Sequence, residues 1–433
     1  MVKVILMNAP VAQMSEHARL TLPLGLAYIG GALLDAGHRV TGIDFNVSGL
    51  DLDRVSRVVQ RQKPSLVGIS ALTETYPNAL AIAERVKLVD PSVTVVLGGA
   101  HPTILPEDVL EQAAVDYVVV GSGEASMVEL AAYLERGEGS PMTIAGLGHR
   151  LEDGTVLVNQ RRKLPHPDSL PRPARDLFPI QLYRGKFNVL TATGSCPYRC
   201  PFCSAAAIWE GRRSTRSPES IVEEIEALIR DYDADYIFFT DDVLTLEKKW
   251  VFRLLESLEG LSRPITWGCA TRVDLVDEQL LLAMSSAGCR AIQFGVESGS
   301  QDILDSVKGV NKMQVLTAVA ASVGAGIDTL CSFMAPFPED TVETIRETGA
   351  FMRTLHDAGS KISLSYTAPF PGTTFFEHAE ELGLTILANG WQDYDAKHVT
   401  FETRHLSAAE IEVELKGIEE MLGMTRTTVT SDQ

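Results

Sequence analysis

The sequence predicts an α/β protein with an N-terminal doubly wound, Rossmann-like domain, a partial (β/α)6 barrel and a small C-terminal region. Short apolar runs alternate with amphipathic segments in two series, and a proline-rich stretch separates the series. Continuous Val, Ile and Leu runs joined by helical segments are typical of parallel sheets. Three of the six cysteines stand close together in CPYRCPFC, directly after the first strand of the second series.

Composition sets limits on the class of protein. A chain of 433 residues, 45% hydrophobic and 22% charged, can form two or more domains with full cores. No apolar run reaches the roughly 18 residues of a membrane span, and the start MVKVILMNAP lacks the features of a signal peptide. The other cysteines are scattered, as in a reducing cytoplasm. The net charge of −19 disfavours a polyanion. We expect a cytoplasmic protein with no nucleic-acid or membrane partner.

The first series, residues 1–135, predicts a sheet with helices on both faces. Its apolar runs predict strands at 2–8, 39–46, 65–72, 94–99 and 117–121. The segments between them predict helices at 24–36, 51–62, 76–89, 106–113 and 125–135. A doubly wound sheet binds its ligands at the carboxyl ends of the strands.

Those carboxyl ends carry glycine-rich or polar loops. The loops are DFNVSG from Asp44, SALTETY from Ser70, GGAHPT from Gly98 and GSGEAS from Gly121. Glycine lets a ligand approach the backbone closely, although glycines can also serve tight turns alone. Four such loops in succession favour a large planar or nucleotide-bearing ligand.

A break in the pattern divides the chain. Residues 136–188 contain a small hairpin, EDGTVLVNQRR, and the proline-rich stretch LPHPDSLPRPARDLFP, which we interpret as a linker. Residues 189–385 form the second series, and residues 386–433 a C-terminal region that covers the barrel mouth and ends in a frayed tail, TRTTVTSDQ. The second series predicts strands at 188–193, 236–242, 265–270, 291–298, 330–336 and 361–366. In a barrel of this kind the active face lies at the strand C-termini.

The cysteine spacing C-x3-C-x2-C indicates a metal site with an open position. Four thiolates close a zinc site or fully ligate a cubane cluster, whereas three leave one position free. Zinc held by three cysteines and a histidine is the alternative, but no histidine lies between His166 and His356.

The cysteine motif and its context resemble the radical S-adenosylmethionine (SAM) superfamily. GGAHPT, VVGSGEAS, TDD, FGVESGS and PFPGT resemble its subgroup with an N-terminal cobalamin-binding domain, over residues 1–385. The resemblance implies that Cys196, Cys200 and Cys203 hold a 4Fe–4S cluster whose fourth iron binds SAM. An electron from flavodoxin or ferredoxin would cleave SAM to methionine and a 5′-deoxyadenosyl radical.

The resemblance also implies a SAM site on the second sheet. Asp241, and less so Asp242, matches the segment that contacts the methionyl amine, although paired carboxylates can instead cap a helix. Glu297 and Ser298 match the ribose-contacting strand end, and the backbone from Tyr366 to Pro369 matches the adenine edge. Arg272 is expected to pair with the SAM carboxylate or, alternatively, to form a surface ion pair. APFPED, from Ala335, departs from the family's glycine-rich GLPGET, so no contact is assigned there.

For cobalamin, the resemblance implies a site at the N-terminal loops. The D-x-H-x-x-G motif of many cobalamin proteins reads DFNVSG here, with Asn46 in place of the histidine, which predicts base-off cobalamin without a histidine ligand. His101 is expected to bond the corrin or its tail, or to cap its loop. The expected cobalamin-binding residues are Leu24, Asn46, Ser70, Leu72, Thr73, Gly98, Gly99, His101, Pro102, Thr103, Gly121, Gly123 and Glu124.

Together these features predict a cobalamin-dependent radical SAM methyltransferase. By resemblance it moves a methyl group from methylcobalamin to an unactivated carbon or a phosphinate phosphorus of a small molecule, as in antibiotic biosynthesis. The alternatives are a cyclase or ring-rearranging enzyme with the same cofactors, and a cluster-bearing sensor or electron carrier. No cysteine precedes Cys196, which disfavours a methylthiotransferase. The aromatic and histidine residues of the C-terminal region, which either contact substrate or merely pack, are Trp391, Tyr394, His398 and His405.

Overall fold

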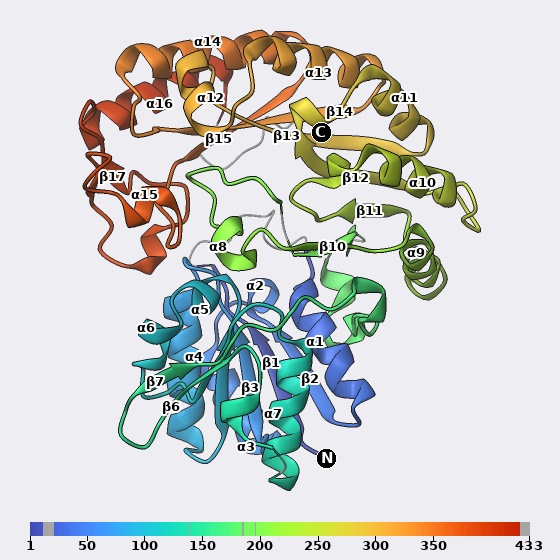
Figure 1. Cartoon of the computed structure of the whole chain (residues 1–433), viewed down its shortest axis with the longest axis vertical. Coiled ribbons are helices and arrows are strands. Elements are labelled where there is room, and N and C mark those ends of the chain that lie inside the picture. The colour runs from blue at the N-terminus through green and yellow to red at the C-terminus, as the bar shows by residue number, and fades with distance from the viewer. Residues whose placement is uncertain (12–20, 138, 184–185, 195, 425–433) are drawn as a thin grey trace. The chain divides into compact units, whose positions relative to one another are not determined.

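The computed structural model describes residues 1–11, 21–137, 139–183, 186–194 and 196–424 (Figure 1). The chain forms two compact units. The first comprises Met1–Gly185 with Ala207–Glu210, and the second comprises Lys186–Ala206 with Gly211–Gln433. The frayed tail expected at 425–433 lies outside the described residues.

The first unit is built on a mostly parallel sheet, as predicted. Within the described residues, its strand order is β2-β1-β3-β4-β5-β6-β7, with β1 to β5 parallel and the last two strands antiparallel. The bounds are β1 (Lys3–Asn8), β2 (Arg39–Asp44), β3 (Leu66–Ser70), β4 (Thr94–Gly98), β5 (Tyr117–Val119), β6 (Leu147–Arg150) and β7 (Val156–Val158).

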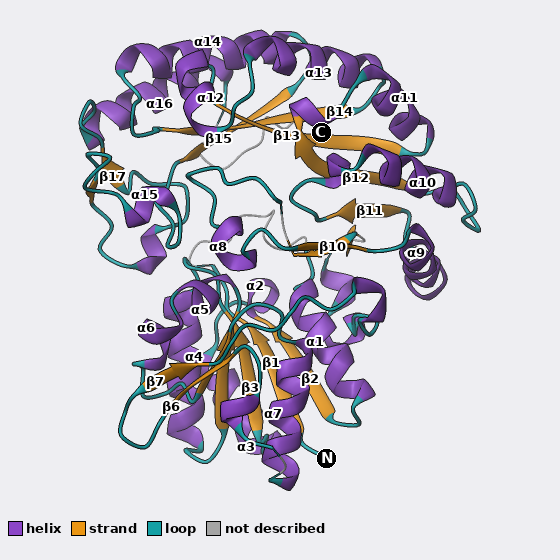
Figure 2. Ribbon diagram, viewed as in Figure 1, coloured by secondary structure: helices purple, strands orange, loops and turns teal. Residues whose placement is uncertain are grey.

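Helices cover both faces of this sheet (Figure 2). α1 packs on α7, and α3 packs on α4. Because both faces are covered, Leu66 and the centre of β1 are fully buried, which explains their continuous apolar runs. The bounds are α1 (Leu24–Asp35), α2 (Phe45–Ser48), α3 (Leu52–Gln62), α4 (Tyr76–Val89), α5 (Ala100–Ile104), α6 (Pro106–Leu110) and α7 (Glu124–Arg136).

The stretch expected as a linker is part of the first unit, which differs from the predicted boundary at residue 135. β6 and β7 pair with the sheet edge and extend it. Phe178 of the proline-rich stretch and Tyr183, which follows it, belong to the core of the unit, and Ala174 donates its N–H to the Ala27 carbonyl of α1 at 2.8 Å. The apolar side chains between the prolines therefore bury this stretch against α1. The predicted helix 106–113 ends at Leu110, where a turn from Gln112 to Val115 follows.

The second unit has a parallel sheet whose spatial order follows the chain order. Over the described part of the chain this order is β15-β14-β13-β12-β11-β8, with each neighbouring pair parallel. The sheet is a partial barrel, as predicted. The bounds are β8 (Lys186–Val189), β11 (Tyr236–Phe239), β12 (Thr266–Arg272), β13 (Cys289–Glu297), β14 (Asp328–Ala335) and β15 (Lys361–Tyr366).

Connections of one hand place the barrel helices on the outer face of this sheet (Figure 1). Burial therefore alternates along β13 and β14, so that Phe294 and Cys331 are buried while Gln293, Ser332 and Glu297 on the inner face are partly exposed. The helix bounds are α9 (Pro218–Tyr232), α10 (Lys248–Leu258), α11 (Glu278–Ser286), α12 (Gln301–Val307), α13 (Lys312–Gly324) and α14 (Val342–Asp357).

The strand predicted at 188–193 is instead two short strands. β8 ends at Val189, and β9 (Ala192–Gly194) turns away to pair antiparallel with β10 (Arg213–Thr215). The cysteine motif and α8 (Ala205–Trp209) therefore lie in the loop of a hairpin. Short 3-10 helices lie at Pro141–Thr143, Pro167–Ser169, Arg175–Leu177, Ile180–Leu182, Leu244–Leu246, Val273–Leu275 and Trp391–Asp393.

The C-terminal region is part of the second unit. Phe375, Leu384 and Phe401 form a buried cluster with residues of α12 and with Phe337. α16 lies against α14, begins at a capping box of Ser407 and Glu410, and ends at Gly423 in the left-handed conformation. The bounds are α15 (Thr374–Glu377), β16 (Thr385–Ile386), β17 (Phe401–Glu402) and α16 (Ala408–Leu422).

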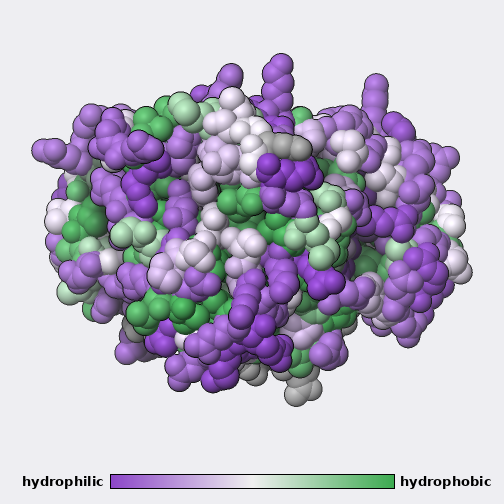
Figure 3. Space-filling model, turned by 90° about the horizontal axis from the view of Figure 1, so that it is seen from below, coloured by the Kyte–Doolittle hydropathy of each residue, from purple (hydrophilic) through white to green (hydrophobic). Residues whose placement is uncertain are grey.

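Hydrophilic residues cover most of the face seen in Figure 3, with smaller hydrophobic patches between them. Among the described residues, no helix combines the length and the apolar character needed to cross a membrane.

Candidate functional site

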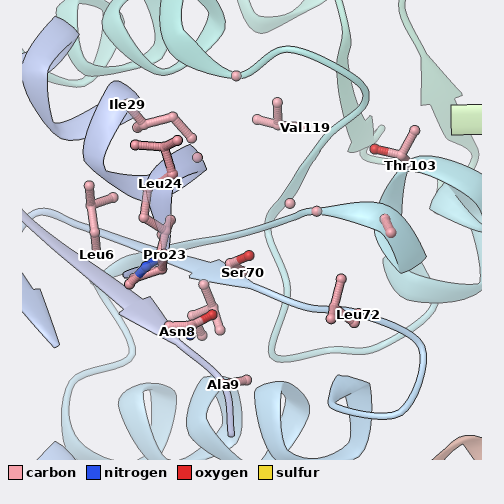
Figure 4. Close-up of a pocket in the computed structure, with 18 of the residues that line it drawn as sticks. Leu6, Asn8, Ala9, Pro23, Leu24, Ile29, Ser70, Leu72, Thr103 and Val119 are labelled. Atoms are coloured by element: carbon pink, nitrogen blue, oxygen red, sulfur yellow. The ribbon is translucent and has the colours of Figure 1, made fainter. Parts of the chain in front are cut away.

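A cavity of about 490 Å³ opens in the first unit at the carboxyl ends of its parallel strands (Figure 4). The order 2-1-3-4-5 places the reversal of winding between β1 and β3, where ligands of doubly wound sheets bind. Asn8 ends β1 and Ser70 ends β3, and both line the cavity. The fold therefore creates the opening at the site that the sequence predicts.

The structure brings ten of the expected cobalamin-binding residues together around this cavity. These are Leu24, Asn46, Ser70, Leu72, Gly98, Gly99, Thr103, Gly121, Gly123 and Glu124. Glycine is required at Gly99, whose φ is +108° and where a Cβ would lie 2.5 Å from the Ala71 carbonyl oxygen. Gly121 has a φ of +80° and donates its N–H to the Thr103 hydroxyl at 3.1 Å. Burial raises the pKa of the Glu124 carboxyl.

Asn46, the residue in place of the histidine, holds the backbone beside the cavity. Its Oδ1 accepts a hydrogen bond from the Val11 N–H at 3.0 Å, and its own N–H donates to Asp44 Oδ1 at 2.9 Å. Asp44 is buried and also accepts from the Tyr183 hydroxyl at 2.7 Å and from the Asn8 amide at 2.9 Å. Burial raises the pKa of Asp44, and these hydrogen bonds oppose the rise. Asp44 is thus a scaffold residue of the loop.

The described lining of the cavity does not include Thr73, His101 or Pro102. His101 is fully buried and stacks on the Tyr76 ring, with 4.2 Å between the ring centroids. Burial lowers the pKa of His101 to about 4, so the imidazole is neutral at pH 7. The structure therefore places His101 beneath its loop, in contact with α4.

The cysteine motif lies in the hairpin loop of the second unit. Cys203 donates its N–H to the Cys200 carbonyl at 3.0 Å, and Cys196 donates its N–H to Asp242 Oδ2 at 3.5 Å. Burial raises the pKa of all three thiols, that of Cys203 to about 11. At Cys200 the positive charges of Lys308 and Arg272 oppose this rise in pKa. These cations favour the thiolate form that binds metal.

Asp241 contacts both sides of the base of the β9–β10 hairpin. Its Oδ2 accepts a hydrogen bond from the Thr191 N–H at 2.8 Å, and its Oδ1 lies 3.8 Å from Arg213 Nη2 of β10. The side chain is buried, and burial raises the pKa of its carboxyl. Asp242, the second carboxylate of the pair, is exposed beside Cys196.

Arg272 contacts the cysteine loop through an aromatic ring. Its guanidinium lies 3.9 Å from the centre of the Tyr198 ring, in the range of a cation–π contact. Its Nε and Nη2 also donate to Asp274 Oδ1 and Oδ2, at 2.9 and 3.1 Å. Since Arg272 is 5% exposed, the alternative of a surface ion pair does not describe it.

Glu297 ends β13 in an unusual conformation. Its φ is +79°, which is uncommon for a residue with a side chain, and the strand register shifts at this point. Lys308 donates to Glu297 Oε1 at 2.6 Å and to the Gly295 carbonyl at 2.5 Å. The Lys308 side chain is 5% exposed and that of Glu297 14% exposed, so the ion pair is largely buried. Lys308 therefore holds the strained end of β13 in place.

Two further expected residues lie at strand ends. Ser298 is buried, with its hydroxyl 3.1 Å from that of Thr348. Tyr366 ends β15, and its N–H donates to the Ala396 carbonyl at 2.9 Å. The carboxyl edge of the second sheet therefore brings together Asp241, Arg272, Glu297, Ser298 and Tyr366, each at or beside a strand end.

Comparisons with known proteins match both units. The B12 binding domain matches residues 15–131, and the radical SAM superfamily matches residues 190–352. An uncharacterized methyltransferase of Pyrococcus horikoshii is 31% identical over 90% of this chain and 85% of its own length.

The chain belongs to the cobalamin-dependent radical SAM methyltransferase family.

Two other known proteins are also similar to this chain. The anaerobic magnesium-protoporphyrin IX monomethyl ester cyclase of Rubrivivax gelatinosus is 28% identical over 86% of this chain and 68% of its own length. The radical SAM methyltransferase TsrM of Kitasatospora setae, solved with cobalamin and a 4Fe–4S cluster, has the same fold. It superimposes with a TM-score of 0.78 at 20% identity, over 97% of this chain and 88% of TsrM.

The cofactors of this radical SAM enzyme are a 4Fe–4S cluster, SAM and cobalamin. The cavity fits part of a cobalamin because it is apolar and glycine-lined at the switch point. The cysteine loop fits an iron–sulfur cluster by its donors, three thiols beside two cations. Among the described residues, no three His, Cys, Asp or Glu side chains are gathered closely enough to hold a metal ion, so the fit rests on donor chemistry.

Sequence reasoning missed several residues of these sites. Lys308 lies on α12's C-terminal side, where nothing in the local pattern predicts a contact with β13. Ile208 and Trp209 line the cavity of the first unit although they follow the cysteine motif in the chain. Only the three-dimensional fold brings segments so distant in sequence together, so no local signal indicated them.

Proposed function

We propose that this enzyme transfers a methyl group to an unactivated carbon, or a phosphinate phosphorus, of a small-molecule substrate. The observation that carries the proposal is the presence of two cofactor sites in one chain, each at the carboxyl edge of its own parallel sheet. A radical site alone would serve many reactions, whereas a corrinoid site adds a methyl carrier.

When bound, the cluster would supply the electron that cleaves SAM to methionine and a 5′-deoxyadenosyl radical, and cobalamin would supply a carrier for the methyl group. The chain's own residues would hold and orient them. Cys196, Cys200 and Cys203 would ligate the cluster. The Glu297 carboxylate would accept hydrogen bonds from the ribose hydroxyls of SAM. Its ion pair with Lys308 would fix the orientation of this carboxylate. Arg272 would support the cluster loop through Tyr198.

Asn46 would leave the corrinoid base-off. An amide is a poor ligand for cobalt, and the Asn46 oxygen already accepts a hydrogen bond from Val11. Asn46→His is expected to keep bound hydroxocobalamin and to shift its visible spectrum. An unchanged spectrum would show that cobalt does not face this loop.

The inner face of the second sheet supports a polar, small-molecule substrate. Gln293 donates to the Ser332 hydroxyl at 2.8 Å, and Ser363 donates to the same hydroxyl at 3.2 Å. These partly exposed groups on three adjacent strands offer hydrogen bonds at the barrel interior. The net charge of −19 disfavours a polyanionic substrate.

The C-terminal aromatics support packing, the second of the two roles considered. The ring centroids of Trp391 and Tyr394 lie 5.4 Å apart. The Trp391 ring also contacts Phe376, and the Tyr394 ring contacts Phe370. His398 is 60% exposed and lies 2.9 Å from Asp395, while His405 lies 3.5 Å from Glu339. His398 is therefore the better candidate for a substrate contact, and His398→Ala with intact cofactor spectra and slower turnover would support that role.

The test is product analysis of the reconstituted enzyme. With SAM labelled in its methyl group, hydroxocobalamin and a flavodoxin or ferredoxin reductant, we expect both S-adenosylhomocysteine and 5′-deoxyadenosine, and label in the corrinoid. Detection of 5′-deoxyadenosine without S-adenosylhomocysteine would overturn methyl transfer.

That result would favour the second candidate, a cyclase or ring-rearranging enzyme with the same cofactors. The similarity to the Rubrivivax gelatinosus cyclase supports this candidate. The two candidates share the radical site and differ in whether SAM also donates its methyl group.

A further inference from the structure

Part of the wall of the cobalamin cavity comes from a segment of the hairpin loop. Ala207–Glu210 belong to the first unit, and Ile208 and Trp209 line the cavity. In the chain these two residues follow Cys203 by five and six positions. The segment is the C-terminal end of α8, a helix of five residues, which is too short to hold its own conformation in water. An interaction outside the helix must therefore fix it.

Arg161 supplies that interaction. Its Nη1 donates to the carbonyls of Ala207 and Ile208, at 3.1 and 3.0 Å. Carbonyls at the end of a helix have no donors within the helix, and a cation there also opposes the negative end of the helix dipole. Arg161 Nη1 lies 3.3 Å from Glu210 Oε1 as well.

The other Nη atom of the guanidinium reaches a second part of the cavity lining. Arg161 Nη2 donates to the Thr103 carbonyl at 3.1 Å, and Thr103 itself lines the cavity. The Thr103 hydroxyl in turn accepts the N–H of Gly121, another lining residue. One planar guanidinium therefore joins two walls of the same cavity, which a lysine ammonium cannot reproduce with the same geometry.

The backbone after the segment turns sharply. Glu210 has a φ of +54° and Gly211 a φ of +69°, so two consecutive residues adopt the left-handed conformation. For a glutamate this conformation costs about 1–2 kcal/mol, so it persists where neighbouring contacts hold it. Arg161 contacts Ile208, which precedes this turn, and Glu210, which is its first residue.

We propose that Arg161 is a positioning residue for cobalamin: it fixes Ala207–Glu210 so that Ile208 and Trp209 form one wall of the cofactor cavity. The proposal rests on the assignment of this cavity to cobalamin. Ile208 and Trp209 would then be cobalamin-cavity residues that lie outside the N-terminal series. Arg161 would hold these two residues in place and is not itself expected to touch the corrinoid.

The experiment compares hydroxocobalamin binding to full-length, iron-reconstituted variants. Arg161→Gln is expected to weaken binding at least about tenfold, which corresponds to roughly 1.4 kcal/mol. The matched control is the neighbouring Arg162→Gln, because Arg162 bonds Glu129 at 2.7 Å on the outside of α7. The control is expected to change the dissociation constant less than about twofold. Both variants should keep the wild-type iron content, and Arg161→Lys should bind with intermediate affinity.

Two further variants separate the possible failures. Gly98→Ile fills the cavity from β4, where a Cβ would meet Val119 only at ordinary contact distances of 3.7 and 3.8 Å, and should abolish binding. Wild-type affinity in Gly98→Ile would overturn the cavity assignment. Loss of binding in Gly98→Ile with wild-type affinity in Arg161→Gln would overturn the role of Arg161 alone.

If Arg161→Gln does not fold, Trp209→Ala tests whether the segment Ala207–Glu210 forms part of the cobalamin cavity. This variant keeps the arginine and removes part of the wall. Weakened hydroxocobalamin binding with full iron content would support the proposal, and wild-type affinity would overturn it.

Discussion

The two sheets of this protein are built from the same alternation of strand and helix, yet they bury their strands differently. In the first unit the order reverses between β1 and β3, so helices cover both faces and consecutive residues in the centres of these strands are buried. In the second unit the order never reverses, so one face stays open and burial alternates along β13 and β14. The direction of winding therefore decides where each sheet accepts a ligand, at its edge in the first unit and also on its inner face in the second.

Substitution of a cluster cysteine is expected to have the largest effect, because it should abolish cofactor binding in the second unit and leave that of the first unit unchanged. Cys203→Ala should abolish iron retention and 5′-deoxyadenosine formation, because it removes one of three thiolates while the corrinoid cavity is unchanged. The matched control is Cys331→Ala, which changes a fully buried cysteine of β14. Iron analysis and hydroxocobalamin binding check both variants. Equal iron loss in the control would mean that iron content reports folding and not ligation.

A large effect on stability is expected at the largely buried ion pair of Lys308 and Glu297 in the second unit. Lys308→Met leaves Glu297, whose side chain is only 14% exposed, without its partner, so it should destabilise the fold by about 3 kcal/mol and weaken SAM binding. Lys361→Met is the control, since its pair with Asp328 is exposed and contributes less than about 1 kcal/mol. Urea unfolding and SAM titration measure the two effects. Similar losses in both variants would contradict the role given to Lys308.

The difference in burial between the sheets can be tested with one substitution at two places. Leu66→Ala in β3 removes a side chain with no exposed surface and should cost about 2–5 kcal/mol. Leu330→Ala in β14 removes a partly exposed side chain on the inner face and should cost less than about 1.5 kcal/mol. Equal losses in urea unfolding would show that the inner face of the second sheet is as fully covered as the first sheet.

A smaller, pH-dependent effect is expected at the end of β14. Burial raises the pKa of Asp340 from 3.8 to about 6, although its carboxylate accepts from the Phe337 N–H and the Thr344 hydroxyl. Because the folded form binds this proton more tightly than the unfolded chain, stability should fall as pH rises from 3.8 to about 6, by roughly 3 kcal/mol at most. Asp340→Asn should flatten this slope in unfolding measurements between pH 4 and about 7. An unchanged slope would assign it to other groups.

The sequence predicted most of the framework because local patterns encode it. The strands β1 to β5 and helices α1, α3, α4 and α7 lie within two residues of their predicted bounds, since apolar runs and amphipathic segments report local burial. The interpretation of the proline-rich stretch as a linker differs from the structure, because Phe178 and the following Tyr183 pack into the first unit through contacts distant in sequence.

The sites were predictable where a motif carries the chemistry. The cysteines and the glycine loops stand out in the sequence, and ten of the loop residues do converge on one cavity. Residues that act through distant contacts do not stand out. Lys308, Arg161 and Trp209 reach their positions through the fold, and His101 stacks on Tyr76 outside the described lining of the cavity.

The central claim, that one chain holds both a cluster and a corrinoid, is tested most directly by cofactor stoichiometry. The full chain would be reconstituted anaerobically with iron and sulfide, offered hydroxocobalamin and desalted, and iron and corrinoid would be measured per chain with the visible spectrum. We predict one 4Fe–4S cluster and one base-off corrinoid per chain. A full cluster without retained corrinoid would contradict this claim, because it would mean that the cavity of the first unit does not bind cobalamin.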